Sequence, residues 1–319
     1  MDEKETIKSC TCVIPCYNEE EAIPEFYREM QKIRKQMEEE LKFTLLFVDD
    51  GSSDRTLEIL KRLSGEDEQV CYLSFSRNFG KEAALYAGLE HAKGDYIAVM
   101  DVDLQDPPEL LPQMYESVIR EGYDSVGCRR VSRKGEPLMR SFFARRFYGI
   151  MRRISNTDIM DGARDFRFMT RQVADAILSL GEYNRFSKGI FGWVGFRTKW
   201  IPYENRERAA GKTKWSFWKL VLYSIEGIAA FSTKPLMIAS VVGVLFCMVS
   251  LILMLFIFGR AALYGDPVAG WPSMVCIITF LGGIQLFCLG IIGMYLSKTY
   301  LEVKRRPVYL IKEKSTCII

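Results

Sequence analysis

The chain has 319 residues, a charged fraction of 26% and a formal net charge of +3. This length fits one large domain or two smaller ones, and the small net charge argues against nucleic acid as a partner. His91 is the single histidine. Catalytic or metal sites that need several histidines are therefore excluded.

In chain order, the first 100 residues alternate short apolar runs with helical patterns. The apolar runs predict strands at Thr11–Pro15, Phe43–Val48, Val70–Phe75 and Tyr96–Met100. Strands that alternate with helices indicate an α/β fold with a mostly parallel sheet and helices on both faces. Such sheets bind ligands at the carboxyl ends of their strands. A polar cluster follows each predicted strand, reading YNEEE, DDGSSD, SRNFGK and DVDLQD in turn.

The cluster DVDLQD places Asp101, Asp103 and Gln105 at alternate positions after an apolar strand. Residues two apart on an extended chain point to the same side, so we expect these oxygens to converge on one hard cation, Mg²⁺ or Mn²⁺. The alternative is a turn with solvated carboxylates, because two alternating aspartates are common by chance. The position opposite a second acidic turn favours the metal site.

That second turn contains Asp49 and Asp50. Their carboxylates are predicted to accept hydrogen bonds from the ring N–H of a base and from ribose hydroxyls. The alternative is capping of the next helix by Ser52, Ser53 or Asp54. Both roles are compatible, because they use different residues.

Two basic segments follow. Between Arg129 and Arg153 there are nine basic residues and one acidic residue. An apolar helical face in this stretch favours a helix on an anionic membrane surface, and a helix packed against the soluble core is the alternative. The second segment is expected to hold phosphates at the level of the lipid headgroups, or to be ordinary juxtamembrane charge. Its cations and aromatic residues are Arg206, Arg208, Lys212, Lys214, Trp215, Phe217 and Trp218.

Two stretches near the C-terminus, Pro235–Phe258 and Pro267–Ser297, contain no charged residue. A helix of about 24 residues rises about 36 Å, which exceeds the roughly 30 Å hydrocarbon core of a bilayer. We therefore predict two transmembrane helices, at about 235–258 and 273–297. The alternative is a buried hairpin of soluble helices.

The distribution of charge predicts how these helices are oriented. Residues 1–10 are charged and lack the apolar core of a signal peptide. The loop Gly259–Trp271 carries one Arg and one Asp, whereas the segment after the second stretch carries six basic residues. The positive-inside rule then places the N-terminal domain and the C-terminal tail in the cytoplasm, in a multi-pass protein of the cell membrane. The nine cysteines are accordingly expected to be reduced thiols.

The predicted organisation has four parts. A soluble domain at 1–205 is followed by a basic and aromatic interfacial segment at 206–233. The two membrane helices occupy 234–297, and a basic cytoplasmic tail forms 298–319. Gly282, Gly283, Gly290 and Gly293 permit close helix packing, so a homo-oligomer is compatible with the sequence.

Seven motifs together resemble a known family. In order they read VIPCYNEEEAI, VDDGSSD, RNFGKEAAL, MDVDLQDPPE, GCRR, DFRFM and GKTKWSFWKL. They resemble the family 2 glycosyltransferases of the GT-A fold, above all the polyprenyl-phosphate branch of dolichol-phosphate mannose synthases and bactoprenol (undecaprenyl-phosphate) glucosyltransferases. The resemblance runs from about residue 11 to 310 and implies a GT-A nucleotide-diphospho-sugar transferase domain at 1–205.

The resemblance also implies roles for individual residues. The nucleotide-sugar site is implied to contain Pro15, Tyr17, Asn18, Glu19, Asp49, Asp50, Lys81, Asp101 and Arg129. Metal and diphosphate are implied to be held by Asp101, Asp103 and Gln105. The implied catalytic carboxylates are Asp165 and Asp103, and the implied cations for the acceptor phosphate are Arg206, Arg208, Lys212 and Lys214. The motifs depart from the family in DVD for the commoner DAD and in KTKW for SKY.

The implied reaction is an inverting transfer of a hexose from a nucleotide-diphosphate sugar to a polyprenyl phosphate at a membrane. UDP-glucose is the first expectation, with UDP-GlcNAc, UDP-galactose and GDP-mannose open. The acceptor phosphate is already largely a dianion at neutral pH. Asp165 is therefore expected to orient a cation such as Arg164 or Arg167, or to place the acceptor, rather than to remove a proton.

Two other functions fit parts of the sequence. A processive polysaccharide synthase would share the alternating aspartates, but the Q-x-x-R-W motif and additional spans of such enzymes are missing from the sequence. A non-catalytic scaffold or flippase partner would keep the fold, and the intact Asp101, Asp103 and Gln105 argue against it.

Overall fold

The computed structural model describes most of the chain, which forms two compact units. One unit comprises residues 1–227 with 307–319, and the other comprises residues 228–306. The described residues are 7–130, 160, 162–204, 234–264 and 270–317. The predicted basic helix between Arg129 and Arg153 and the segment 206–218 therefore lie almost entirely outside the described residues.

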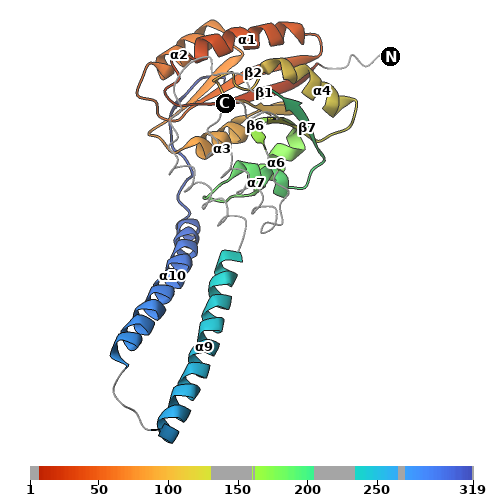
Figure 1. Cartoon of the computed structure of the whole chain (residues 1–319). Coiled ribbons are helices and arrows are strands. Elements are labelled where there is room, and N and C mark those ends of the chain that lie inside the picture. The colour runs from red at the N-terminus through yellow and green to blue at the C-terminus, as the bar shows by residue number, and fades with distance from the viewer. Residues whose placement is uncertain (1–6, 131–159, 161, 205–233, 265–269, 318–319) are drawn as a thin grey trace. The chain divides into compact units, whose positions relative to one another are not determined.

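The first unit is built on one eight-stranded sheet, in the order β7-β5-β6-β4-β1-β2-β3-β8 (Figure 1). Six strands run in one direction, and only β6 and β8 are reversed. The predicted α/β fold with a mostly parallel sheet is thus confirmed. The strands are β1 Lys8–Cys16, β2 Leu41–Asp49, β3 Val70–Phe75, β4 Tyr96–Val99, β5 Ser125–Arg130, β6 Ala163–Thr170, β7 Thr198–Tyr203 and β8 Ile311–Lys314.

Helices cover both faces of this sheet (Figure 1). Strand β2 shows the division, because Leu45 and Phe47 pack on the side of α1 and α2, while Leu46 and Val48 pack on the side of α3. The helices that the structure describes in this unit are α1 Ile23–Gln36, α2 Thr56–Glu66, α3 Lys81–His91, the short 3₁₀ helix η1 Pro108–Leu110, α4 Leu111–Ile119, α6 Arg171–Ser179 and α7 Ser187–Trp193.

Helix α1 shows why the sequence folds in this way. Its buried residues Ile23, Phe26, Met30 and Ile33 recur every three or four positions, so they form one apolar stripe. Pro24 occupies the first turn, where its missing N–H costs no helical hydrogen bond. Full burial of each of these side chains stabilises the fold by roughly 1.5–3 kcal/mol.

Helix α3 approaches the sheet unusually closely at Gly88. A Cβ atom built on Gly88 would lie 2.1 Å from Cγ1 of Val13 in β1. Val13 is itself fully buried, so it has no free space into which to move. Glycine at this position is what lets α3 pack against β1, and α3 begins at the site described below.

The second unit contains two long helices, α9 Lys234–Tyr264 and α10 Trp271–Lys304. They pack as an antiparallel pair, since the ring of Phe246 lies 5.6 Å from that of Phe280 and the Cys288 Sγ lies 3.7 Å from the carbonyl oxygen of Ala239. Large apolar side chains such as Leu286 and Phe287 are exposed along α10.

Within the described residues, one segment, Phe280–Lys304, is long and apolar enough to cross a membrane. The apolar part of α9 that meets the same test in composition, Pro235–Phe246, is shorter. The structure therefore supports one transmembrane helix, and the presence of two stays a prediction.

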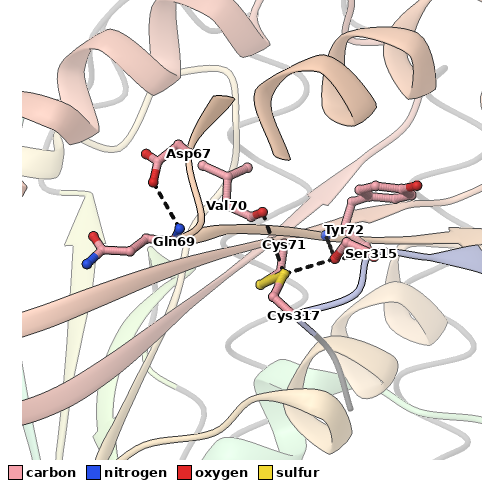
Figure 2. The surroundings of a disulfide bond; sticks show 7 residues. All are labelled: Asp67, Gln69, Val70, Cys71, Tyr72, Ser315 and Cys317. Carbon is pink, nitrogen blue, oxygen red and sulfur yellow. Dashed lines mark hydrogen bonds between the residues drawn. A yellow bond between two sulfur atoms is a disulfide. The ribbon is translucent and has the colours of Figure 1, made fainter. Parts of the chain in front are cut away.

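After α10 the chain returns to the sheet of the first unit. Strand β8 pairs antiparallel with β3, and Ser315 extends this contact through hydrogen bonds with the backbone of Tyr72 (Figure 2). A disulfide joins Cys71 of β3 to Cys317 (Figure 2). The expectation of reduced thiols is thus wrong for this pair, because β8 places residues 246 apart in sequence side by side. No pattern in the C-terminal sequence predicted this strand.

Candidate active site

The topology of the sheet identifies where a ligand is expected to bind. Strand β1 leads to β2 on one side and neighbours β4 on the other, so the strand order reverses between β1 and β4. In open α/β sheets ligands bind at such a switch point, beyond the carboxyl ends of the strands. The loops that follow β1, β2, β3 and β4 carry the four polar clusters of the sequence.

The loops after β1 and β2 are joined to each other by hydrogen bonds. Asn18 has a left-handed φ of 53°, and its Oδ1 accepts a hydrogen bond of 2.8 Å from the N–H of Ser53. The N–H of Asn18 donates to the Oγ of Ser52, and the N–H of Glu19 donates to the Oγ1 of Thr56. Tyr17 is exposed and Pro15 is half-buried beside this pair of loops. The predicted nucleotide residues of the first loop therefore lie on a fixed backbone.

Asp49 and Asp50 have internal partners. Asp49 is buried and accepts hydrogen bonds from the N–H of Ser52 at 3.0 Å and from the Oγ of Ser74 at 2.7 Å. Asp50 accepts from the backbone N–H groups of Phe79 and Gly80, just before α3. Burial raises the pKa of Asp50 to about 6, although these hydrogen bonds act in the opposite direction. Both carboxylates thus shape the loops, and their contact with a nucleotide stays a prediction.

The cluster after β4 forms a turn, not an extended segment. Strand β4 ends at Val99, and Leu104 has a left-handed φ of 55°. Asp103 Oδ1 accepts a hydrogen bond from the N–H of Gln105, as aspartates often do in turns. The assumption that Asp101, Asp103 and Gln105 alternate along a straight chain is therefore wrong, because residues 102 and 103 form a turn and the left-handed Leu104 bends the backbone between Asp103 and Gln105.

The reversed strand β6 brings Asp165 to this turn. Val99 of β4 is in register with Arg167 of β6, and β6 runs antiparallel to β4. Two residues before Arg167, Asp165 accordingly lies beyond the end of β4, level with the loop that begins at Asp101. Asp165 and Asp101 meet in space although they lie more than sixty residues apart in sequence.

Lys81, the first residue of α3, lies between these two carboxylates. Its ammonium lies 2.7 Å from Asp101 and 2.6 Å from Asp165. Burial alone would raise the pKa of Asp165, but the charges of Lys81, Lys188 and Arg164 outweigh it and hold this pKa well below its usual range. Burial likewise opposes the charge of Lys81, yet the two aspartates raise its pKa well above normal. Asp165 is thus an ionised, paired carboxylate and a weak base.

A second network of hydrogen bonds, which the sequence did not predict, holds the turn after β4 in place. Arg164 donates from Nε to Asp106 at 3.1 Å and from Nη2 to the Oε1 of Gln105 at 3.0 Å. The hydroxyl of Tyr203 donates to the same oxygen of Asp106, which is almost fully buried. Burial raises the pKa of Asp106, and Arg164 and Tyr203 oppose that rise. Asp106 follows β4, Arg164 lies at the start of β6 and Tyr203 ends β7. Because these residues are far apart in the chain, no local sequence pattern could have predicted their contact.

The cation that Asp165 contacts directly is Lys81, not Arg164 or Arg167, and its alternative role in placing the acceptor stays a prediction. Arg129 lies at the end of β5, where its Nη1 is 3.9 Å from the sulfur of Met160. The predicted contact of Arg129 with the donor stays a prediction. The four predicted acceptor cations, Arg206, Arg208, Lys212 and Lys214, lie outside the described residues.

The side chains around the turn fit a divalent cation in part. Among the described residues, no group of three or more His, Cys, Asp or Glu side chains is arranged to hold a metal ion. Asp101 already binds the ammonium of Lys81, which shows that a cation fits against this carboxylate. Asp101 and Asp103 would supply hard oxygen ligands and leave open positions for diphosphate oxygens. The oxygen of Gln105 is bonded to Arg164, so its role as a ligand stays a prediction.

Comparison with known proteins identifies the family. Residues 11–178 match the model of Glycosyl transferase family 2. The chain is 42% identical over 300 residues to the prophage bactoprenol glucosyl transferase homolog of Escherichia coli K12, covering 94% of this chain and 97% of that protein. It is 41% identical over 301 residues to the putative glycosyltransferase CsbB of Bacillus subtilis 168, covering 94% and 90%.

Solved structures show a more distant likeness. The mannosyltransferase PcManGT of Pyrobaculum calidifontis, in complex with GDP-Man and Mn²⁺, is 16% identical, with a TM-score of 0.45 over 93% of this chain and 87% of that one. This likeness is too distant to assign ligands. The family model covers more than half of the chain, and the relatives match it almost from end to end. The chain therefore belongs to Glycosyl transferase family 2 and is a glycosyltransferase with a GT-A-like α/β fold.

Proposed function

We propose that this glycosyltransferase transfers a hexose, most favourably glucose, from a nucleotide-diphosphate sugar to a polyprenyl phosphate at the cytoplasmic face of a membrane. Similarity over nearly the full length to proteins named bactoprenol glucosyl transferase carries the proposal. The apolar segment Phe280–Lys304 supports a membrane-bound acceptor. The pairing of Asp101 and Asp165 through Lys81 at the switch point supports a site for a charged donor.

In this proposal the donor lies across the carboxyl ends of β1, β2 and β4. A UDP-sugar is the favoured donor, and its nucleotide would contact the loops that carry Pro15, Tyr17, Asn18, Glu19, Asp49, Asp50, Lys81 and Arg129. Mg²⁺ or Mn²⁺ would be held by Asp101 and Asp103, with Gln105 as a further candidate. The metal would stabilise the negative charge of the leaving nucleoside diphosphate.

The acceptor phosphate needs no general base, because it is already largely a dianion at neutral pH. Lys81 holds the Asp165 carboxylate, whose pKa lies well below its usual range. We therefore assign Asp165 a positioning role: it fixes the ammonium of Lys81 beside Asp101. Inversion at the anomeric carbon then follows from direct attack by the phosphate oxygen.

The membrane arrangement in this proposal keeps the two predicted spans, with the catalytic unit and the C-terminus in the cytoplasm. Arg206, Arg208, Lys212 and Lys214 would attract the phosphate of the lipid at the membrane surface. A homo-oligomer built on the glycines of the second span remains part of the proposal.

The deciding experiment measures transfer of radiolabelled sugar from a panel of UDP- and GDP-sugars to undecaprenyl phosphate in detergent, with Mg²⁺ or Mn²⁺. We expect label from one donor to enter the organic phase, and EDTA and Asp103→Ala to abolish this transfer. No transfer from any donor, by protein that still binds nucleotide and metal, would contradict the proposal.

A further inference from the structure

A cavity of about 220 Å³ opens beside the candidate active site, on the side of β6, β7 and α7. It lies away from the loops of β1, β2 and β3 that we assign to the nucleotide. The described lining includes Arg164, Arg167, Lys188, Phe191, Phe196 and Trp200. Three of these side chains are cationic and none is a carboxylate.

Arg167 is the buried cation of this cavity. Its side chain is 3% exposed, and the guanidinium lies 4.5 Å from the ring centre of Phe191 and 5.0 Å from that of Trp200. Nη1 donates to the Oγ of Ser125 at 2.9 Å, whereas Nε finds no acceptor among the described residues. A buried N–H of a charged group without an acceptor is costly. This Nε is itself closed off from solvent, so an anion in the cavity would meet the guanidinium at its other nitrogens.

The wall behind Arg167 has no room for a further side chain. A Cβ atom built on Gly127 of β5 would lie 2.8 Å from the ring of Trp200 and 3.3 Å from Nη2 of Arg167. The two aromatic rings and the close strand therefore fix the guanidinium in one position. Burial lowers the pKa of Arg167 to about 10, which still leaves it charged at neutral pH.

The cations of the cavity interact with Asp165 of the candidate active site. Asp165 interacts with Lys188 and with Arg167, and its carboxylate also binds Lys81. An anion bound by Arg167 and Lys188 would accordingly lie next to the carboxylate that we place beside the donor. The apolar rings of Phe191, Phe196 and Trp200 suit the first carbons of a prenyl chain more than a second phosphate.

We propose that this cavity binds the phosphate monoester head of the acceptor, with Arg167 as its buried anchor and Lys188 as its outer cation. The inference rests on the proposed function and adds a second set of phosphate ligands to the predicted cations of residues 206–214. Arg164 contributes charge but is already bonded to Asp106 and Gln105. Specificity for a monoester over an alcohol then comes from these two cations.

The test measures binding of farnesyl phosphate and of farnesol to the full-length protein in detergent, by calorimetry, without any donor. We expect Lys188→Gln and Arg167→Lys to weaken binding of farnesyl phosphate about 10- to 100-fold, as for loss of a charge-assisted hydrogen bond. Binding of farnesol and of UDP should change less than about twofold. Lys188 is only half-buried, so we expect Lys188→Gln to fold. This variant keeps the test valid if Arg167→Lys does not fold.

Lys199→Gln is the matched control. Lys199 precedes Trp200 on β7 but points to the opposite face, where it binds Glu121 at 2.5 Å. Unchanged binding of farnesyl phosphate in both folded cavity variants would overturn the inference, even if wild-type protein transferred sugar to undecaprenyl phosphate. Binding that depends on Lys188 in a protein without transfer activity would support the cavity and refute the proposed function instead.

Discussion

Lys81 is a shared counter-ion for two carboxylates that come from different parts of the sheet. Its ammonium contacts both Asp101 and Asp165, and neither carboxylate has another cation as close among the described ion pairs. A change at this one residue therefore alters the charge of both sides of the site.

We predict that Lys81→Gln makes activity pH-dependent. Without the ammonium, burial of Asp165 is opposed only by the charges of Lys188 and Arg164, so its pKa rises and its ionised form is lost at a higher pH than in the wild type. Wild-type activity should stay level from about pH 8 to about pH 5 with respect to this group, while that of the variant declines. Lys81→Arg keeps the charge and serves as the control, and parallel pH–rate profiles for all three proteins would contradict the prediction.

Asp165→Asn tests the positioning role directly. We expect the variant to retain most of kcat and to raise the KM for the nucleotide sugar about tenfold, since the amide still fills the site but holds Lys81, which we assign to the donor, less firmly. Steady-state kinetics with both substrates varied would measure the two constants. A large loss of kcat that high pH restores would instead identify Asp165 as a proton acceptor.

Asp50 should make stability depend on pH. Its folded pKa of about 6 exceeds the ordinary value of 3.8, so the folded state holds the proton more tightly than the unfolded state. Stability from this group is therefore fully present below about pH 4 and is lost as the pH rises through about 6. The thermal midpoint of the wild type should exceed that of Asp50→Asn by an amount that shrinks as the pH rises through this range. A difference in midpoint that stays constant with pH would refute the prediction.

At the scale of elements, the close contact between α3 and β1 sets the position of Lys81. Any side chain at Gly88 collides with the buried Val13. The start of α3 is also fixed from the other side, because Glu82 accepts a hydrogen bond of 3.0 Å from the N–H of Ser187 in α7. The helix is thus held at both its middle and its beginning.

Gly88→Ala should accordingly lower stability by about 1–3 kcal/mol, as overpacking does in buried sites. Gly65→Ala in α2 is the matched control, because nothing lies within 4 Å of a Cβ atom there. We expect that control to be neutral or to stabilise by about 0.5–1 kcal/mol through helix propensity. Thermal unfolding followed by circular dichroism would compare them, and equal midpoints for the two variants would contradict the packing argument.

The same elements show what the sequence can and cannot predict. Strands β1 to β4 and helix α3 were predictable, because each is an apolar or helical pattern bounded by turn residues nearby in sequence. The position of Asp165 depends on β6 running backwards between β4 and β5, which is a long-range pairing. The turn at Asp101 was misjudged because a left-handed Leu104 carries no glycine signal. Asp106, Arg164 and Tyr203 form a network only after folding.

At the scale of the whole molecule, the C-terminal strand covers an edge that would otherwise be open. Strand β8 pairs with β3, the ring of Tyr309 stacks on Phe75 at 5.1 Å, and Lys61 binds Glu313 at 2.7 Å. An unpaired edge strand is a template for pairing with other chains.

Removal of residues 307–319 should therefore cause aggregation, even though every candidate site residue is kept. Size-exclusion chromatography in detergent should show a shift from a single peak to large species. Cys317→Ser keeps β8 and should remain monodisperse, so it separates the strand from the disulfide. If the truncated protein eluted like the full chain, pairing of β8 with β3 would not be needed to prevent aggregation.

The bond between Cys71 and Cys317 turns most of the polypeptide into a closed ring, and both long helices, α9 and α10, belong to that ring. A protease site engineered between α9 and α10 would cut the ring once without releasing a fragment. The two pieces should migrate as one band on a non-reducing gel and as two bands after reduction, or in Cys317→Ser. In its oxidised form, the enzyme would survive a single nick between α9 and α10 as one covalent molecule.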